Sequence, residues 1–221
     1  MKYKWLHQKQ NSSCILFFNG WGMDEHAVSH LNPNTYDVCM IYDYNPIQQI
    51  PDIFDSYEKL YLVAWSLGVY AAEITLHNSA LQFEKKIAIN GTGKPIDDAY
   101  GIPEKIFTAT LTTWNEKNRE RFNIRMCGGH THYSQIKHHM SLRSIENQHD
   151  ELKHIYETYT HKNAQTLFVW DTAIIGTNDL IFSKENQENY WSKQVNSLIL
   201  PFSHFPFSDS QKWDNIIEEK I

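Results

Sequence analysis

The chain has 221 residues, of which 41% are hydrophobic and 14% aromatic, a composition that can build one large folded domain and argues against intrinsic disorder. No apolar run approaches the length of a membrane span, and the first residues lack the apolar stretch of a signal peptide. Three scattered cysteines, Cys14, Cys39 and Cys127, provide no disulfide framework. We therefore expect a cytoplasmic protein that does not contact a membrane.

The net charge of −6 is unevenly distributed along the chain. The segment 105–143 contains all four arginines and three lysines but only two acidic residues, a local charge of +5 that leaves −11 for the remainder. Charge segregated in this way suggests a basic surface that meets an acidic partner.

Short apolar runs alternate with helical stretches along most of the chain. We expect strands at 2–8, 14–18, 37–44, 59–65, 86–90, 167–170, 173–176 and 197–200, the first of them at an edge of the sheet, and helical stretches after Asp24, after Ser66 and over 211–221. Because strands that alternate with helices form parallel sheets, the expected fold class is α/β. The polar, histidine-rich block at about 97–165 interrupts this alternation. We interpret it as a helical cap inserted between sheet strands of a single domain over 1–221.

The segment Ala64-Trp65-Ser66-Leu67-Gly68 lies where a predicted buried strand meets a helix. It matches the G-x-S-x-G nucleophile elbow, with alanine as a small residue in the first position. A serine at such a turn projects above the sheet, and the next backbone N–H, that of Leu67, can face a developing oxyanion. The segment predicts an α/β-hydrolase fold with Ser66 as nucleophile. Serine followed by glycine also occurs in ordinary turns, so the pattern alone leaves a purely structural role open.

A serine nucleophile needs an imidazole base and a carboxylate that orients the base. In α/β-hydrolases these groups follow in the order Ser, Asp or Glu, His, each after a strand. Asp179 follows the predicted strand 173–176, and His204 follows the strand 197–200. They are the expected acid and base, with Asp171, after the run 167–170, as the alternative acid.

The second oxyanion donor is expected in the glycine turn Gly20-Trp21-Gly22, which follows the strand 14–18. The flanking glycines let the backbone approach a substrate closely, so the Trp21 N–H could point at the same position as that of Leu67. Aromatic residues beside the nucleophile and the base are expected to line the substrate pocket, namely Trp65, Phe205 and Phe207.

The chain contains a series of further motifs in a fixed order: Asn19-Gly20-Trp21-Gly22-Met23-Asp24, Tyr42-Asp43-Tyr44, the serine segment, Asn90-Gly91-Thr92, Pro95-Ile96-Asp97-Asp98, Gly101-Ile102-Pro103, Arg125-Met126-Cys127-Gly128 and His204-Phe205-Pro206-Phe207. Over nearly the whole chain they resemble the BioG-type pimeloyl-[acyl-carrier protein] methyl ester esterases of bacterial biotin synthesis. The related BioH-type esterases usually have histidine at the position of Asn19, a residue that is not expected to be the base.

This resemblance implies that Ser66, His204 and Asp179 form the catalytic triad and that Trp21 and Leu67 supply the oxyanion hole. The implied reaction is hydrolysis of the methyl ester of pimeloyl-[acyl-carrier protein] to pimeloyl-[acyl-carrier protein] and methanol. An acyl-carrier thioesterase or a generic short-chain carboxylesterase would use the same triad. A catalytically silent carrier-binding module would keep only the fold.

The implied partner, an acyl carrier protein, is strongly acidic and would suit the basic segment. Lys117, Arg121 and Arg125 recur at i, i+4 and i+8 on one face of a predicted helix, and together with Arg143 they are expected to contact the carrier. A solvated helix face is the alternative for this stripe. The cysteine and histidines at 127, 130, 132, 138 and 139 match no zinc signature, and no nucleotide- or nucleic-acid-binding motif occurs. We therefore expect no metal, cofactor or nucleic acid. We also expect a monomer.

Overall fold

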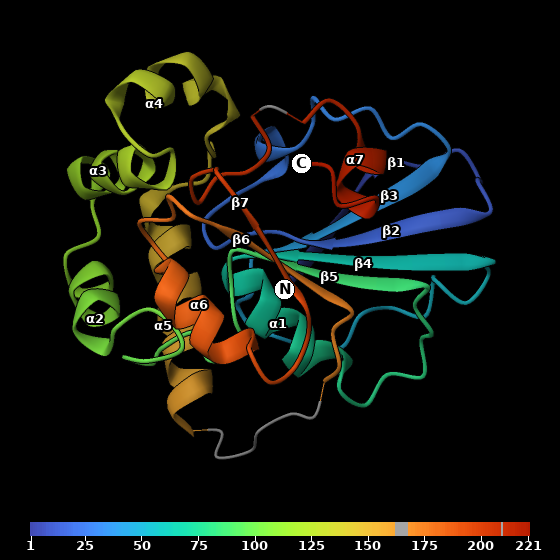
Figure 1. Ribbon diagram of the computed structural model, residues 1–221, viewed down its shortest axis with the longest axis horizontal. Helices are drawn as coiled ribbons and strands as arrows, with labels where there is room; N and C mark the ends of the chain where they lie inside the picture. The colour runs from blue at the N-terminus through green and yellow to red at the C-terminus, as the bar shows by residue number, and fades with distance from the viewer. Residues whose placement is uncertain (162–167, 209) are drawn as a thin grey trace.

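The computed structural model describes residues 1–161, 168–208 and 210–221. These residues form a seven-stranded sheet in the order β1-β3-β2-β4-β5-β6-β7 (Figure 1). The strands are β1 (Lys2–His7), β2 (Ser13–Phe18), β3 (Tyr36–Tyr42), β4 (Lys59–Trp65), β5 (Lys85–Ile89), β6 (Thr172–Gly176) and β7 (Ser197–Leu200). Only β1, at an edge, runs antiparallel to its neighbour. The expected α/β class is confirmed.

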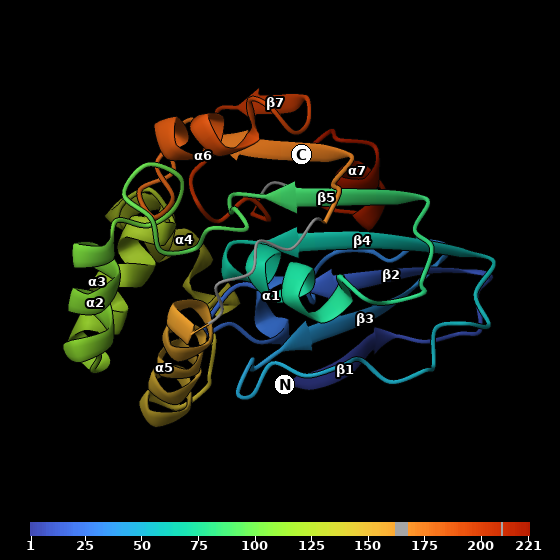
Figure 2. The ribbon, with the colours of Figure 1, turned by 90° about the horizontal axis from the view of Figure 1, so that it is seen from below.

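Helices cover both faces of the sheet and one of its ends. One face carries α1 (Leu67–Leu76) and α6 (Lys184–Trp191), and the other carries η1 (Glu25–Ala27) and α7 (Trp213–Ile217). Between β5 and β6 the chain forms α2 (Glu104–Thr112), α3 (Glu116–Met126), α4 (His130–Ile136), η2 (Lys137–His139) and α5 (Ile145–His161). Figure 2 shows α2–α5 beyond the carboxyl ends of the parallel strands. Among the described residues, no helix combines the length and apolarity that a membrane crossing needs.

The central strands are apolar on both sides because both of their faces are covered. In β2, Cys14, Leu16 and Phe18 face the core that contains α1, whereas Ile15 and Phe17 face the core that contains α7. All five side chains are fully buried. A continuous apolar run is the pattern expected of such a doubly covered parallel strand.

Three expected elements differ from the structure. Leu167 lies outside the described residues, and Phe168 to Trp170 form no strand, so the prediction of a strand at 167–170 is wrong. Trp170 instead packs against α1, where its indole N–H donates to the Glu73 carboxylate at 2.9 Å. The helix expected after Asp24 is the short 3-10 turn η1, and the closing helix begins at Trp213 rather than at residue 211.

Arg143 lies inside the molecule rather than on its basic surface. Its side chain is 7% exposed, and its guanidinium lies 2.8 Å from a Glu151 carboxylate oxygen and 3.0 Å from one of Asp43. It also donates to the Met23 carbonyl oxygen at 3.2 Å. The expectation that Arg143 contacts a carrier is therefore corrected, because this guanidinium holds the start of α5 against the end of β3.

Replacing Arg143 by methionine should destabilise the fold by about 3–5 kcal/mol, because two buried carboxylates would lose their shared counter-charge. Chemical denaturation measures the change in the free energy of unfolding. Arg121→Met is the matched control, since Arg121 is exposed on α3 with its guanidinium 3.4 Å from Asn118 Oδ1, and it should contribute less than about 1 kcal/mol. Equal losses from the two substitutions would contradict the assignment of Arg143 to a buried ion network.

Candidate active site

Ser66 lies in the sharp turn between β4 and α1, with φ 59° and ψ −130°. The turn is possible because its neighbours are very small. A Cβ atom on Gly68 would lie 2.4 Å from the Phe18 carbonyl oxygen, and one on Gly91 would lie 2.2 Å from the carbonyl oxygen of Ser66 itself. The hydroxyl is thereby placed at the amino end of a ten-residue helix, where partial positive charge favours a developing anion.

The three residues expected to form a triad lie together in the structure. His204 Nε2 is 2.9 Å from Ser66 Oγ, and His204 Nδ1 is 2.8 Å from Asp179 Oδ2. All three residues are buried, with exposed fractions of 6% for Ser66 and Asp179 and 1% for His204. The arrangement can pass the serine proton to the imidazole while the carboxylate holds the imidazole ring in one orientation.

The Asp179 carboxylate is held by several donors besides the imidazole. Its Oδ1 accepts from the backbone N–H groups of Ile181 at 2.7 Å and Phe182 at 2.9 Å. Its Oδ2 also accepts from the Gln187 side-chain amide at 3.2 Å. These hydrogen bonds to both carboxylate oxygens fix the direction of the Asp179 side chain.

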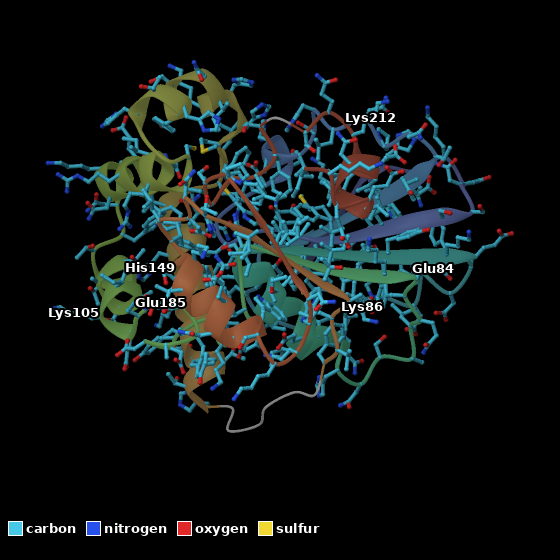
Figure 3. The ribbon with its side chains drawn as sticks, viewed as in Figure 1. Glu84, Lys86, Lys105, His149, Glu185 and Lys212 are labelled. Atoms are coloured by element: carbon cyan, nitrogen blue, oxygen red, sulfur yellow. The ribbon has the colours of Figure 1, made fainter. Side chains whose placement is uncertain are left out.

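Asp171, the alternative acid, lies at the amino end of β6, away from this site. Its carboxylate accepts from the backbone N–H of Lys86 at 2.8 Å and lies 3.3 Å from the Lys86 ammonium group. Figure 3 labels Lys86 near the start of β5, far from Lys105 on α2. Asp171 therefore lies far from α2, which is beyond the opposite, carboxyl ends of the strands. Because residues 168–170 form no strand, no strand end brings Asp171 to His204.

Two residues to which the sequence analysis gave no such role hold the His204 loop in place. The Asn90 side-chain amide donates to the carbonyl oxygens of Ser203 at 2.9 Å and His204 at 3.0 Å, and its oxygen accepts from the Gly176 N–H at 2.7 Å. The Trp65 indole N–H donates to the His204 carbonyl oxygen at 2.9 Å. Asn90 is a polar residue directly after the buried strand β5, and this position is the sequence signal that could have indicated its role.

A largely apolar cavity, hereafter the site cavity, opens beside Ser66 and contains about 530 Å³ of empty space, counting the part open to solvent. Besides Ser66 and His204 it is lined by Gly20, Trp21, Trp65, Leu67, Ile102, Ile106, Phe107, Thr110, Phe122, Arg125, Met126, Leu152, Leu180 and Ile181. Trp65 therefore lies where the sequence placed it. Phe205 and Phe207 do not line this cavity, and that expectation is corrected. Their rings pack edge-on against Trp65 in the core beneath the site, at centroid distances of 5.6 and 5.1 Å.

The two expected oxyanion donors lie beside Ser66. Trp21 and Leu67 both line the site cavity with Ser66. Within the described part of the chain, no acceptor is found for the backbone N–H of either residue. Two such N–H groups next to a nucleophile can stabilise the oxyanion of a tetrahedral intermediate.

Neither the cysteines nor one group of possible metal ligands lines the site cavity. Burial raises the pKa of the Cys39 and Cys127 thiols to about 12, so they remain protonated near neutral pH. Within the described residues, one group has three ligand atoms close enough to share a metal ion, and it consists of Asp24, Glu25 and His26. Each already has a partner, since Asp24 binds the Leu142 N–H and the His26 ring, and Glu25 binds the Lys4 ammonium group.

Comparison with known proteins identifies the family of the chain. Residues 1–216 match the family described as pimeloyl-ACP methyl esterase BioG. The chain is 41% identical over 184 residues to a Bacteroides fragilis protein named malonyl-[acyl-carrier protein] O-methyltransferase, a match covering 83% of this chain and 37% of that protein. The chain thus spans little more than a third of that relative.

Solved structures extend the comparison. The crystal structure of BioG from Haemophilus influenzae is 32% identical with a TM-score of 0.89, covering 97% of this chain and 98% of that one. A peroxisomal alpha-beta-hydrolase of Saccharomyces cerevisiae, 15% identical with a TM-score of 0.59 over 97% of this chain and 78% of its own, shares the fold alone. The chain therefore belongs to the BioG family of pimeloyl-ACP methyl esterases and has the α/β-hydrolase fold.

Proposed function

We propose that the chain is a serine esterase that hydrolyses the methyl ester of a pimeloyl chain carried on acyl carrier protein, as a step of biotin biosynthesis. The observation that carries this proposal is the hydrogen-bonded series Ser66, His204 and Asp179 at an apolar cavity. The family to which the chain belongs supports the choice of substrate.

In the acylation step, Ser66 Oγ attacks the ester carbonyl carbon while His204 Nε2 accepts the serine proton. The negative charge on the carbonyl oxygen is stabilised by the N–H groups of Trp21 and Leu67. As the tetrahedral intermediate collapses, the bond to the methoxy oxygen breaks and His204 returns the proton, so that methanol leaves. Asp179 stabilises the imidazolium throughout.

In the deacylation step, a water molecule attacks the acyl-enzyme carbonyl and His204 Nε2 accepts one of its protons. The bond to Ser66 Oγ breaks, the serine recovers a proton from the imidazole, and the free carboxylic acid leaves. The other end of the chain, which is joined to the carrier through a thioester, takes no part in these steps.

The lining of the site cavity suits a short methylene chain. Ile102, Ile106, Phe107 and Leu152 contribute apolar surface next to Ser66. A shallower groove, hereafter the outer groove, runs between α2 and α3 and shares Ile106, Thr110, Phe122 and Arg125 with the site cavity. We infer that the acyl chain enters from this groove, which keeps the thioester away from the nucleophile.

The basic stripe on α3, made of Lys117, Arg121 and Arg125, is exposed, and two of its residues lie at this entrance. Arg121 and Arg125 line the outer groove, and the Arg125 guanidinium lies 5.9 Å from the centre of the Phe122 ring. Cations at the rim of an entrance attract an acidic carrier and mainly raise the rate of encounter. The stripe is therefore the proposed docking surface for the carrier.

Replacing Ser66 by alanine should lower methyl ester turnover by about a thousandfold or more, because the nucleophile is removed while the substrate cavity is kept. Released methanol and intact thioester should be followed together on pimeloyl-carrier methyl ester. Ser203→Ala, next to His204 and also buried, is the matched control and should stay within about threefold of the wild type. Serine-dependent loss of the thioester instead of the methyl ester would make the protein a thioesterase, and equal turnover of free methyl esters would favour a generic carboxylesterase.

Reversing two charges of the stripe, Lys117→Glu with Arg121→Glu, should raise the KM for the carrier-bound ester about tenfold at low salt, with a smaller effect as ionic strength rises. Turnover of a small free ester should be unchanged. Arg125 is left in place because it also lines the site cavity. The control with the same change in net charge is Lys9→Glu with Lys212→Glu, both exposed, Lys212 lying near α7 (Figure 3). The docking proposal would be wrong if the stripe variant changed the turnover of both ester substrates equally. It would also be wrong if the two charge reversals had equal effects on the carrier-bound ester.

A further inference from the structure

The glycine turn that carries Trp21 is held by α5 as well as by the sheet. Its Gly20 carbonyl oxygen accepts from the Met23 N–H at 3.2 Å, which closes a β-turn with Trp21 and Gly22 in the two central positions. Gly22 has φ +72°, the value that a type II turn requires at its third residue. Because the Gly20 carbonyl and the Trp21 N–H belong to one planar peptide group, the turn geometry sets the direction of that N–H.

Gln148 of α5 binds this turn at two points. Its side-chain amide donates to the Gly22 carbonyl oxygen at 2.8 Å, and its backbone carbonyl accepts from the Trp21 indole N–H at 2.8 Å. Gln148 is only 4% exposed, so water does not compete strongly for either bond. The main chain and the side chain of one residue thus hold successive residues of the turn.

Glu151, one turn further along α5, binds the N–H group of the same glycine. Its Oε2 accepts from the Gly22 N–H at 2.9 Å, and its Oε1 accepts from the Tyr44 N–H at 2.9 Å. Burial raises the pKa of this carboxyl, and the Arg143 guanidinium at 2.8 Å opposes that effect and favours the anion. Gly22 therefore has both its N–H and its carbonyl oxygen bound by side chains of a single helix.

We propose that Gln148 and Glu151 are positioning residues for the oxyanion donor at Trp21. They act through Gly22, whose two backbone bonds keep the turn in the form that directs the Trp21 N–H toward the substrate carbonyl. In consequence α5 is part of the catalytic framework rather than a lid that can move independently of it. This inference rests on the proposed serine esterase function.

The variant Gln148→Met keeps the length and volume of the side chain and removes its donor. Its kcat for a small free ester should fall about tenfold or more, with the KM changed less than about twofold, because a displaced oxyanion donor weakens binding of the transition state more than that of the substrate. Its affinity for an alkyl boronic acid, which forms a tetrahedral adduct with Ser66, should fall by a similar factor. Thermal unfolding should show that the variant is folded.

Two further variants complete the test. Gly22→Ala should give the same loss of kcat at unchanged KM, because its Cβ would lie 3.3 Å from the Gln148 amide nitrogen at a φ that L residues rarely adopt. Asp150→Asn, on the same helix with a side chain 61% exposed, is the control and should retain wild-type kcat.

The possible outcomes separate the two proposals. A wild type without serine-dependent turnover or boronate adduct would overturn both the esterase function and this inference. An active wild type with wild-type kcat and boronate affinity in folded Gln148→Met would overturn the inference alone. A Gln148→Met variant in which only the KM or the thermal stability changes would also overturn the inference alone.

Discussion

The positive φ of Ser66 is the constraint on which the rest of the site depends. Such a backbone conformation costs about 1–3 kcal/mol for a residue with a side chain, and it persists only where the surroundings leave no alternative. Here the alternatives are blocked by close contacts of Gly68 with the end of β2 and of Gly91 with the turn itself. The parallel register that pairs β2 with β4 and β4 with β5 ends these strands at one level. Ser66, Asn90 and the glycine turn that carries Trp21 consequently meet at the carboxyl ends of these strands.

The histidine loop gains its rigidity from the same core. Asn90 joins the ends of β5 and β6 to the backbone of His204, and the Trp65 indole holds that backbone from below. Phe205 and Phe207, which follow the histidine, pack on Trp65 instead of on a substrate. Because close-packed aromatic rings resist displacement, the loop behaves as part of the core and keeps the imidazole within hydrogen-bond distance of Ser66.

The basic segment contains charges with two different physical roles. Arg143 lies among buried carboxylates, where an ion pair is strong and where removal of one partner is costly. Lys117 and Arg121 are exposed, where salt screens their charges and the main effect is on the encounter with a charged partner. The buried arginine thus supports the contact of α5 with the glycine turn that carries Trp21, whereas the exposed stripe suits the proposed carrier.

The α/β class, the edge strand β1, most strand positions and the placement of Ser66, Asp179 and His204 after strand ends could be predicted from the sequence, since apolar runs and turn residues are local properties. The sequence favoured Asp179 as the acid but left Asp171 open, because the choice depends on which strand end faces His204. The burial of Arg143, Phe205 and Phe207 and the contacts of Gln148 and Glu151 with Gly22 also lay beyond prediction. Each of these contacts joins segments that are far apart in the chain. Burial depends on what packs around a side chain in three dimensions, and no local pattern of residues encodes that packing.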